Sequence, residues 1–123
     1  MPLPSLSESD IQIQVADLLR LHERARGFIF TSIPNEGKDR RNIKRLMKLI
    51  RMGLRKGAGD LLIVRKGQAY FLEIKKPGGT QSKDQLEFEA DAIASGAYYA
   101  LAYSFDEAVK ILQSWSIIPR RGL

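Results

Sequence analysis

The spacing of apolar residues along the chain predicts helices and strands in alternation. Helical spacing begins at Ser7, which can form a weak capping box with Asp10, and it fades at Gly27. An apolar, β-favouring run follows at 28–33 and ends in a turn at 34–37. We therefore expect a long helix and then a strand at the start of the chain.

A second, strongly amphipathic helix is predicted from about Asp39 to Met52, and Gly53 stops it. Its apolar stripe consists of Ile43, Leu46, Met47 and Ile50. The other faces of this helix carry arginine and lysine. A glycine-rich loop, 57–59, follows it.

Two strands at 60–65 and 69–75, joined by a turn at 66–68, form the clearest hairpin in the sequence. Pro77 and the glycines after it break the second strand. A helix is predicted at 82–95, where Ser82 and Gln85 fit a capping box.

The last part of the chain predicts one more strand and one more helix. The continuous apolar run at 97–103 is typical of a buried strand that lies parallel to its neighbour. Ser104 and Glu107 fit a further capping box, and the helix that they start extends to about Ser114. The order α-β-α-β-β-α-β-α indicates the α/β class, a mixed β-sheet flanked by helices, with residues 1–123 as one domain.

The hairpin carries three residues whose chemistry fits together. Because side chains alternate along a strand, Glu73 and Lys75 point to the same face. Folding the hairpin about Gly67 brings Asp60 across from the region of Glu73 and Ile74. The sequence therefore predicts two carboxylates and one ammonium group at one point of the sheet, between a glycine loop and a Pro-Gly-Gly break.

Hydrolysis of a phosphodiester bond needs these residue types. Carboxylate oxygens are hard ligands that bind Mg²⁺ or Mn²⁺, and the metal activates water and clamps the phosphate. A lysine beside it can orient or deprotonate the water and offset phosphate charge. The alternative is that these residues are surface charges and an ordinary cross-strand salt bridge.

Composition excludes several other kinds of site. The chain has no cysteine and one histidine, His22, so disulfides, thiol nucleophiles and sites with several histidine ligands are excluded. No run of about 18 apolar residues could span a membrane, and the N-terminus lacks the pattern of a signal peptide. The expected location is the cytoplasm of a bacterial or phage-infected cell.

The net charge of +6 comes from one segment. Nine basic residues and one acid lie between Lys38 and Lys56. Such a cluster favours contacts with nucleic-acid phosphates, without reading of sequence, although a solvated helix face is the simpler alternative. The candidate DNA-binding residues are Lys44, Arg45, Lys48, Arg51, Arg55 and Lys56.

Five stretches together resemble a known family. They are Ser7–Gln12, Ile33–Gly37, Gly57–Leu62, Phe71–Lys75 and Ser82–Gln85. Their order and spacing resemble the PD-(D/E)XK nuclease superfamily, and within it the small stand-alone form of the virus-type replication-repair nuclease (VRR-NUC) domain. The resemblance covers nearly the whole chain and implies a restriction-endonuclease-like core. One departure is Gly59, where the family usually has proline, which leaves the loop more flexible.

The resemblance also implies roles for individual residues. The implied metal ligands are Glu8, Asp60, Glu73 and the backbone carbonyl of Ile74; the implied catalytic residues are Asp60, Glu73, Lys75 and Gln85. Glu8 is also explained by the helix dipole, and Gln85 by capping. Gln12 and Asn35 are weaker candidates, each with an ordinary surface role as the alternative.

We therefore expect a Mg²⁺- or Mn²⁺-dependent DNA endonuclease. Stand-alone members of the family resemble Holliday-junction resolvases, which implies a branched DNA substrate and a homodimer, since a four-way junction has two-fold symmetry. One alternative function is a nuclease that acts on flaps or nicked duplex. Two others are a DNA-binding module of the same fold without catalysis and a subunit whose basic face binds an acidic protein.

Overall fold

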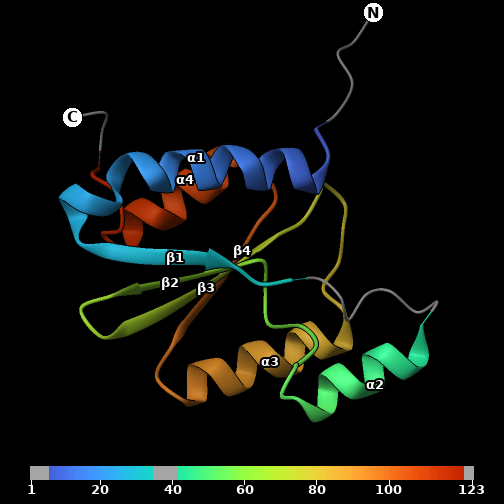
Figure 1. Ribbon diagram of the computed structural model, residues 1–123. Helices are drawn as coiled ribbons and strands as arrows, with labels where there is room; N and C mark the ends of the chain where they lie inside the picture. The colour runs from blue at the N-terminus through green and yellow to red at the C-terminus, as the bar shows by residue number, and fades with distance from the viewer. Residues whose placement is uncertain (1–5, 35–41, 121–123) are drawn as a thin grey trace, which may run out of the picture.

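The computed structural model describes residues 6–34 and 42–120. Their helices and strands are α1 (Glu8–Arg26), β1 (Phe28–Ser32), α2 (Ile43–Arg51), β2 (Leu61–Arg65), β3 (Gln68–Ile74), α3 (Lys83–Ala94), β4 (Tyr98–Ala102) and α4 (Phe105–Ser114). The predicted order and the α/β class are confirmed (Figure 1). The predicted turn at 35–37 and the predicted first turn of the second helix, 39–41, lie outside the described residues.

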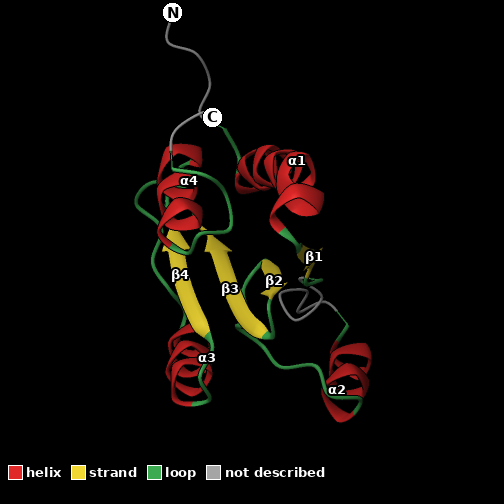
Figure 2. Ribbon diagram, turned by 90° about the vertical axis from the view of Figure 1, so that its left-hand side faces the viewer, coloured by secondary structure: helices red, strands yellow, loops and turns green. Residues whose placement is uncertain are grey.

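One four-stranded sheet separates two layers of helices (Figures 1 and 2). The strand order is β1-β2-β3-β4; the first three strands are antiparallel, and β4 is parallel to β3 as predicted. Helices α1 and α4 cover one face of the sheet, whereas α3 and α2 lie on the side of the other face. The mixed sheet flanked by helices is thus present.

The β2–β3 hairpin turns through Lys66 and Gly67, which both have positive φ angles, 51° and 77°. Two such residues in succession make the tight turn that matches the twist of a hairpin. Arg65 pairs with Gln68, so Gln68 opens β3 and does not belong to the turn as predicted.

The main core lies between the sheet and the α1–α4 layer. Leu61 and Ile63 on β2, and Leu72 and Ile74 on β3, point into it and are almost completely buried. Burial of side chains of this size contributes about 1.5–3 kcal/mol each. Side chains alternate in direction along a strand. The residues that alternate with these four along β2 and β3 therefore face the α3 side of the sheet, where the candidate site lies.

The predicted capping boxes at the starts of α1 and α3 both form. At α4 the prediction is half right. Ser104 Oγ accepts the backbone N–H of Glu107 at 3.1 Å. The Glu107 carboxylate, however, accepts the N–H of Tyr103, at 3.0 Å, in place of the N–H of Ser104 that a capping box would use.

Two elements are less buried than their sequences suggest. Strand β4 is an edge of the sheet, and the side chain of Tyr98 is 51% exposed, so the predicted buried strand is only partly buried. The apolar stripe of α2 forms, but of its four residues only Leu46 is buried. No helix in 6–34 or 42–120 is both long and apolar enough to cross a membrane.

Candidate active site

The hairpin register brings two carboxylates to the same end of the hairpin. Leu61 pairs with Leu72, so Asp60, directly before β2, and Glu73, directly after Leu72, both lie at the end of the hairpin far from its turn. The N–H of Asp60 also donates to the carbonyl of Leu72 at 3.0 Å, which attaches Asp60 to β3. Asp60 is 4% exposed and Glu73 is 1% exposed. The structure therefore places both acids at this end of the hairpin, and both are buried.

A backbone hydrogen bond fixes the orientation of the Asp60 side chain. Its Oδ2 accepts the N–H of Ile74 at 2.6 Å. This bond reaches across the hairpin to the strand that carries Glu73, so it holds the two acids in register. The carbonyl of Ile74, an implied metal ligand, stays a prediction.

Gln85 connects the start of α3 to the buried acid. Its Nε2 donates to Oε1 of Glu73 at 2.7 Å, while its own Oε1 accepts the N–H of Ser82 at 2.8 Å. Gln85 is itself buried. Gln85 therefore caps α3 and also binds Glu73, while its catalytic role stays a prediction.

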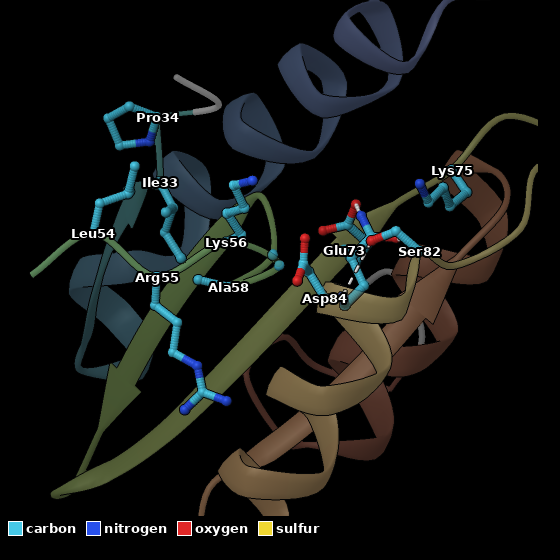
Figure 3. A pocket seen from close by; sticks show the side chains of 13 residues that line it. Ile33, Pro34, Leu54, Arg55, Lys56, Ala58, Glu73, Lys75, Ser82 and Asp84 are labelled. Atoms are coloured by element: carbon cyan, nitrogen blue, oxygen red, sulfur yellow. Dashed lines mark hydrogen bonds between the residues drawn. The ribbon is translucent and has the colours of Figure 1, made fainter. Parts of the chain in front are cut away.

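Glu73 and Lys75 line a common cavity of about 210 Å³ on the α3 side of the sheet (Figure 3). Lys75 is half-buried, and its N–H donates to the carbonyl of Ala102 at 2.9 Å, which continues the β3–β4 pairing past the end of β3. The remaining walls come from the end of β1, the loop after α2 and the start of α3. The cavity therefore joins Glu73 and Lys75 to these three segments, whereas Asp60 is not among its lining residues.

Two polar residues of the cavity were not predicted from the sequence as site residues. Ser82 and Asp84, at the start of α3, both line it. Figure 3 shows Asp84 on the same wall as Ser82. Both lie in one of the stretches that carry the family resemblance, which was the signal available. An acid in the first turn of a helix is otherwise explained by the helix dipole.

The glycine loop before Asp60 is shaped by close packing. A Cβ on Gly57, whose φ is +84°, would lie 2.4 Å from the backbone oxygen of Asp84, so only glycine lets this loop touch α3. Gly59 has a φ of +93°, whereas proline requires about −65°. Proline therefore cannot replace Gly59 in this backbone.

The predicted DNA-binding residues other than Arg55 lie in two places. Lys44, Arg45, Lys48 and Arg51 are exposed on α2. Lys56 lines the cavity itself (Figure 3).

Arg55 differs from the others because its guanidinium group has partners in α3. It forms an ion pair with Asp91 and lies 5.1 Å from the ring centre of Phe88. Arg55 thus attaches the loop after α2 to α3, a role that competes with its predicted contact to DNA.

Glu8, the implied third acidic ligand, has another contact. Its Oε2 accepts the N–H of Lys76 at 3.1 Å, just past β3. Within 6–34 and 42–120, no three acidic, histidine or cysteine side chains are grouped closely enough to hold a metal ion. The structure therefore brings Glu8 to the end of the strand that carries Glu73, but does not join it to Asp60 and Glu73 as a set of three.

The two weaker candidates do not line the cavity in the described residues. Gln12 lies in a separate groove of about 590 Å³ between α1 and β1, together with Ser9 and Ser32. Asn35 lies outside the described residues.

Tyr99, on β4, is a further buried polar residue near the two acids. Burial, followed by the negative charge of Glu73, raises the pKa of Tyr99 well above its ordinary value of 10.0; the nearby Gln81 side chain opposes the shift. Its hydroxyl therefore stays protonated at neutral pH. Sequence analysis missed Tyr99 because it lies within an apolar run.

Comparison with known proteins shows the fold. One solved structure, titled "VRR_NUC domain protein", superposes with a TM-score of 0.68 and 21% identity, over 92% of this chain and 90% of that one. A second, titled "VRR_NUC domain", gives a TM-score of 0.57 and 20% identity, over 85% and 97%. No family model matches the sequence, and no curated protein matches it. The chain therefore has the fold of VRR_NUC domain structures, as the resemblance implied.

Proposed function

We propose that this protein is a metal-dependent endonuclease that hydrolyses phosphodiester bonds of DNA. The observation that carries the proposal is that two acids, Asp60 and Glu73, are buried at the same end of the hairpin, and that Glu73 lines a cavity together with Lys75. The structural likeness to VRR_NUC domains supports it, because their printed name denotes a nuclease.

The buried acid pair fits a divalent cation. Two carboxylates buried at one point repel each other unless a cation or a proton joins them. Their hard oxygen atoms suit Mg²⁺ or Mn²⁺, and Asp60 and Glu73 would hold the ion, with Glu8 and the carbonyl of Ile74 as further candidates. A bound ion supplies Lewis-acid chemistry for attack of water on the phosphate.

The chain's own residues prepare this chemistry. Gln85 holds the Glu73 carboxylate through its 2.7 Å hydrogen bond, and the N–H of Ile74 holds Asp60. Lys75 orients or deprotonates the attacking water and offsets charge on the phosphate. Lys56, on another wall of the cavity, binds a phosphate oxygen.

The exposed basic side chains of α2 bind the DNA backbone without reading base sequence. Branched DNA, above all the four-way junction, is the proposed substrate, and a homodimer is the proposed assembly. The homodimer fits this substrate because two copies related by a two-fold axis present two sites to a junction that also has two-fold symmetry.

The test is cleavage of a labelled four-way junction, beside a linear duplex of the same arms, with Mg²⁺, Mn²⁺ or EDTA. We expect metal-dependent cutting of the junction, little cutting of the duplex, and loss of both in Glu73→Ala. Equal cutting of both DNAs would overturn the junction preference. Binding of DNA by both proteins without any cutting would indicate a non-catalytic DNA-binding module instead.

A further inference from the structure

Three apolar side chains of α2 form a stripe that the described protein leaves uncovered. Ile43, Met47 and Ile50 follow one another at the i, i+4, i+7 spacing of one helix face, and they are 66%, 56% and 40% exposed. Leu46, on the neighbouring face, is the one buried residue of the described helix. A surface helix normally turns its apolar stripe toward the core, so this stripe calls for an external partner.

A basic stripe runs beside the apolar one. Lys44, Lys48 and Arg51 repeat the same spacing one residue further along, which places them about 100° around the helix. All three are exposed, and α2 contains no acidic residue. The helix therefore presents an apolar strip and a cationic strip side by side along its whole length.

The position of α2 relates these stripes to the candidate active site. The chain leaves α2 and enters the segment 54–59, which lines the catalytic cavity. Arg55 and Gly57 attach that segment to α3, through Asp91 and the backbone of Asp84. Figures 1 and 2 show α2 on the α3 side of the sheet, the side on which Glu73 faces the cavity.

We propose that the apolar stripe of α2 packs against base faces exposed at a DNA branch point, while the basic stripe holds the flanking phosphates. This inference rests on the proposed nuclease function and deepens it, because it names DNA with interrupted base stacking as the ligand of α2. Apolar side chains such as isoleucine and methionine serve as wedges between base steps in other DNA-binding proteins. The unstacking that a wedge requires costs least where stacking is already interrupted.

Charge argues for DNA as the occupant over a second copy of this chain. In a two-fold pair of antiparallel α2 helices that meet at their apolar stripes, the stripes of Lys44, Lys48 and Arg51 would lie side by side, and like charges repel. DNA supplies the two complements together, since phosphates match the cationic strip and base faces match the apolar strip. An acidic protein would match the first strip only.

The test measures base unstacking without cleavage. A four-way junction with 2-aminopurine at its branch point is titrated with protein in EDTA, and a linear duplex with the same base serves for comparison. Wild-type protein is expected to raise the 2-aminopurine fluorescence in the junction only. The double variant Ile43→Ser/Met47→Ser should lose this rise and bind the junction about tenfold more weakly, while its affinity for duplex changes less than twofold.

Matched variants separate this effect from misfolding. Leu21→Ser removes an equally exposed apolar residue from α1 and should behave as wild type. Ile43→Val/Met47→Leu keeps the stripe apolar and should restore the fluorescence rise. Thermal melts of all variants should agree, because the changed side chains are exposed.

Three results would overturn the inference. The first is that the double serine variant still raises the fluorescence and binds the junction as tightly as the wild type does. The second is a fall in molar mass on light scattering in that variant alone, which would assign the stripe to a second copy. The third is that the double serine variant loses binding to phosphatidylglycerol vesicles while its binding to DNA equals that of the wild type. Cleavage assays with Mn²⁺ are measured separately, so failure of this inference and failure of the proposed nuclease activity can be distinguished.

Discussion

Gln85 donates a hydrogen bond from Nε2 to Oε1 of Glu73, at 2.7 Å, inside the protein. The other end of the same amide accepts the N–H of Ser82 and so caps α3. One side chain therefore connects the stability of a helix start to the orientation of a candidate metal ligand. Residues that orient metal ligands typically change metal affinity or activity by about 10–100-fold when they are altered.

We expect Gln85→Met to lower the rate of Mn²⁺-dependent DNA cleavage by about 10–100-fold, because Glu73 loses its donor. Ser82→Ala is the matched control. It removes the capping hydroxyl and should lower stability by about 1 kcal/mol, while it leaves the Gln85–Glu73 bond in place and cleavage within a few-fold of wild type. Equal losses of activity in the two variants would show that only the helix start matters.

The packing of Gly57 on α3 gives a second prediction. Gly57→Ala should lower both the melting temperature and the cleavage rate, since its Cβ would collide with the backbone at Asp84 and displace the loop that leads to Asp60. The control is Gly53→Ala, which also has a positive φ but no atom within 4 Å of the added Cβ. It should reduce stability less, by about 1 kcal/mol, and preserve cleavage. Comparable effects of the two changes would contradict this role of the loop.

Arg55 and Lys48 should respond differently to salt. Lys48→Ala removes a proposed phosphate contact and should reduce the slope of log affinity against log salt concentration by about 1. Arg55→Ala should leave that slope unchanged and instead lower stability by about 1 kcal/mol, because its partners are Asp91 and Phe88. A reduced slope for Arg55→Ala would restore the direct DNA contact predicted from the sequence.

The raised pKa of Tyr99 predicts a loss of stability at high pH. The unfolded chain releases this proton near the ordinary pKa of 10.0, but the folded protein retains it to higher pH because Tyr99 is buried near Glu73. The contribution is therefore fully present below pH 10.0 and declines above it. Tyr99→Phe should flatten the alkaline part of a plot of unfolding free energy against pH. An unchanged alkaline slope would count against the shift.

Local rules predicted much of this fold from sequence. Helical spacing and Ser-x-x-Asp/Gln caps marked the starts of α1 and α3, and strand alternation placed Glu73 and Lys75 on one face, where both line the cavity. These features depend on residues a few positions apart, or on one tight hairpin. Such local determinants are visible without knowledge of tertiary contacts.

Features that depend on distant packing were harder to predict. The exposure of Met47 follows from how α2 attaches to the body, and the Arg55–Asp91 pair joins residues 36 positions apart. Likewise, Glu8 was expected beside Asp60 and Glu73, but its carboxylate accepts the N–H of Lys76. Helical periodicity gives the face of a residue but not the neighbour that this face meets.

The central claim is that the two buried acids Asp60 and Glu73 hold the metal for phosphodiester hydrolysis. The most direct test is the rate of cleavage of a labelled four-way junction during titration with Mn²⁺, for wild type and Asp60→Asn. Asparagine can still accept the N–H of Ile74, so the variant should keep its fold and melt like wild type without metal. We predict saturable, EDTA-sensitive cleavage by the wild type and none by Asp60→Asn. Cleavage by the variant at the wild-type rate, or cleavage by the wild type in EDTA, would contradict the claim.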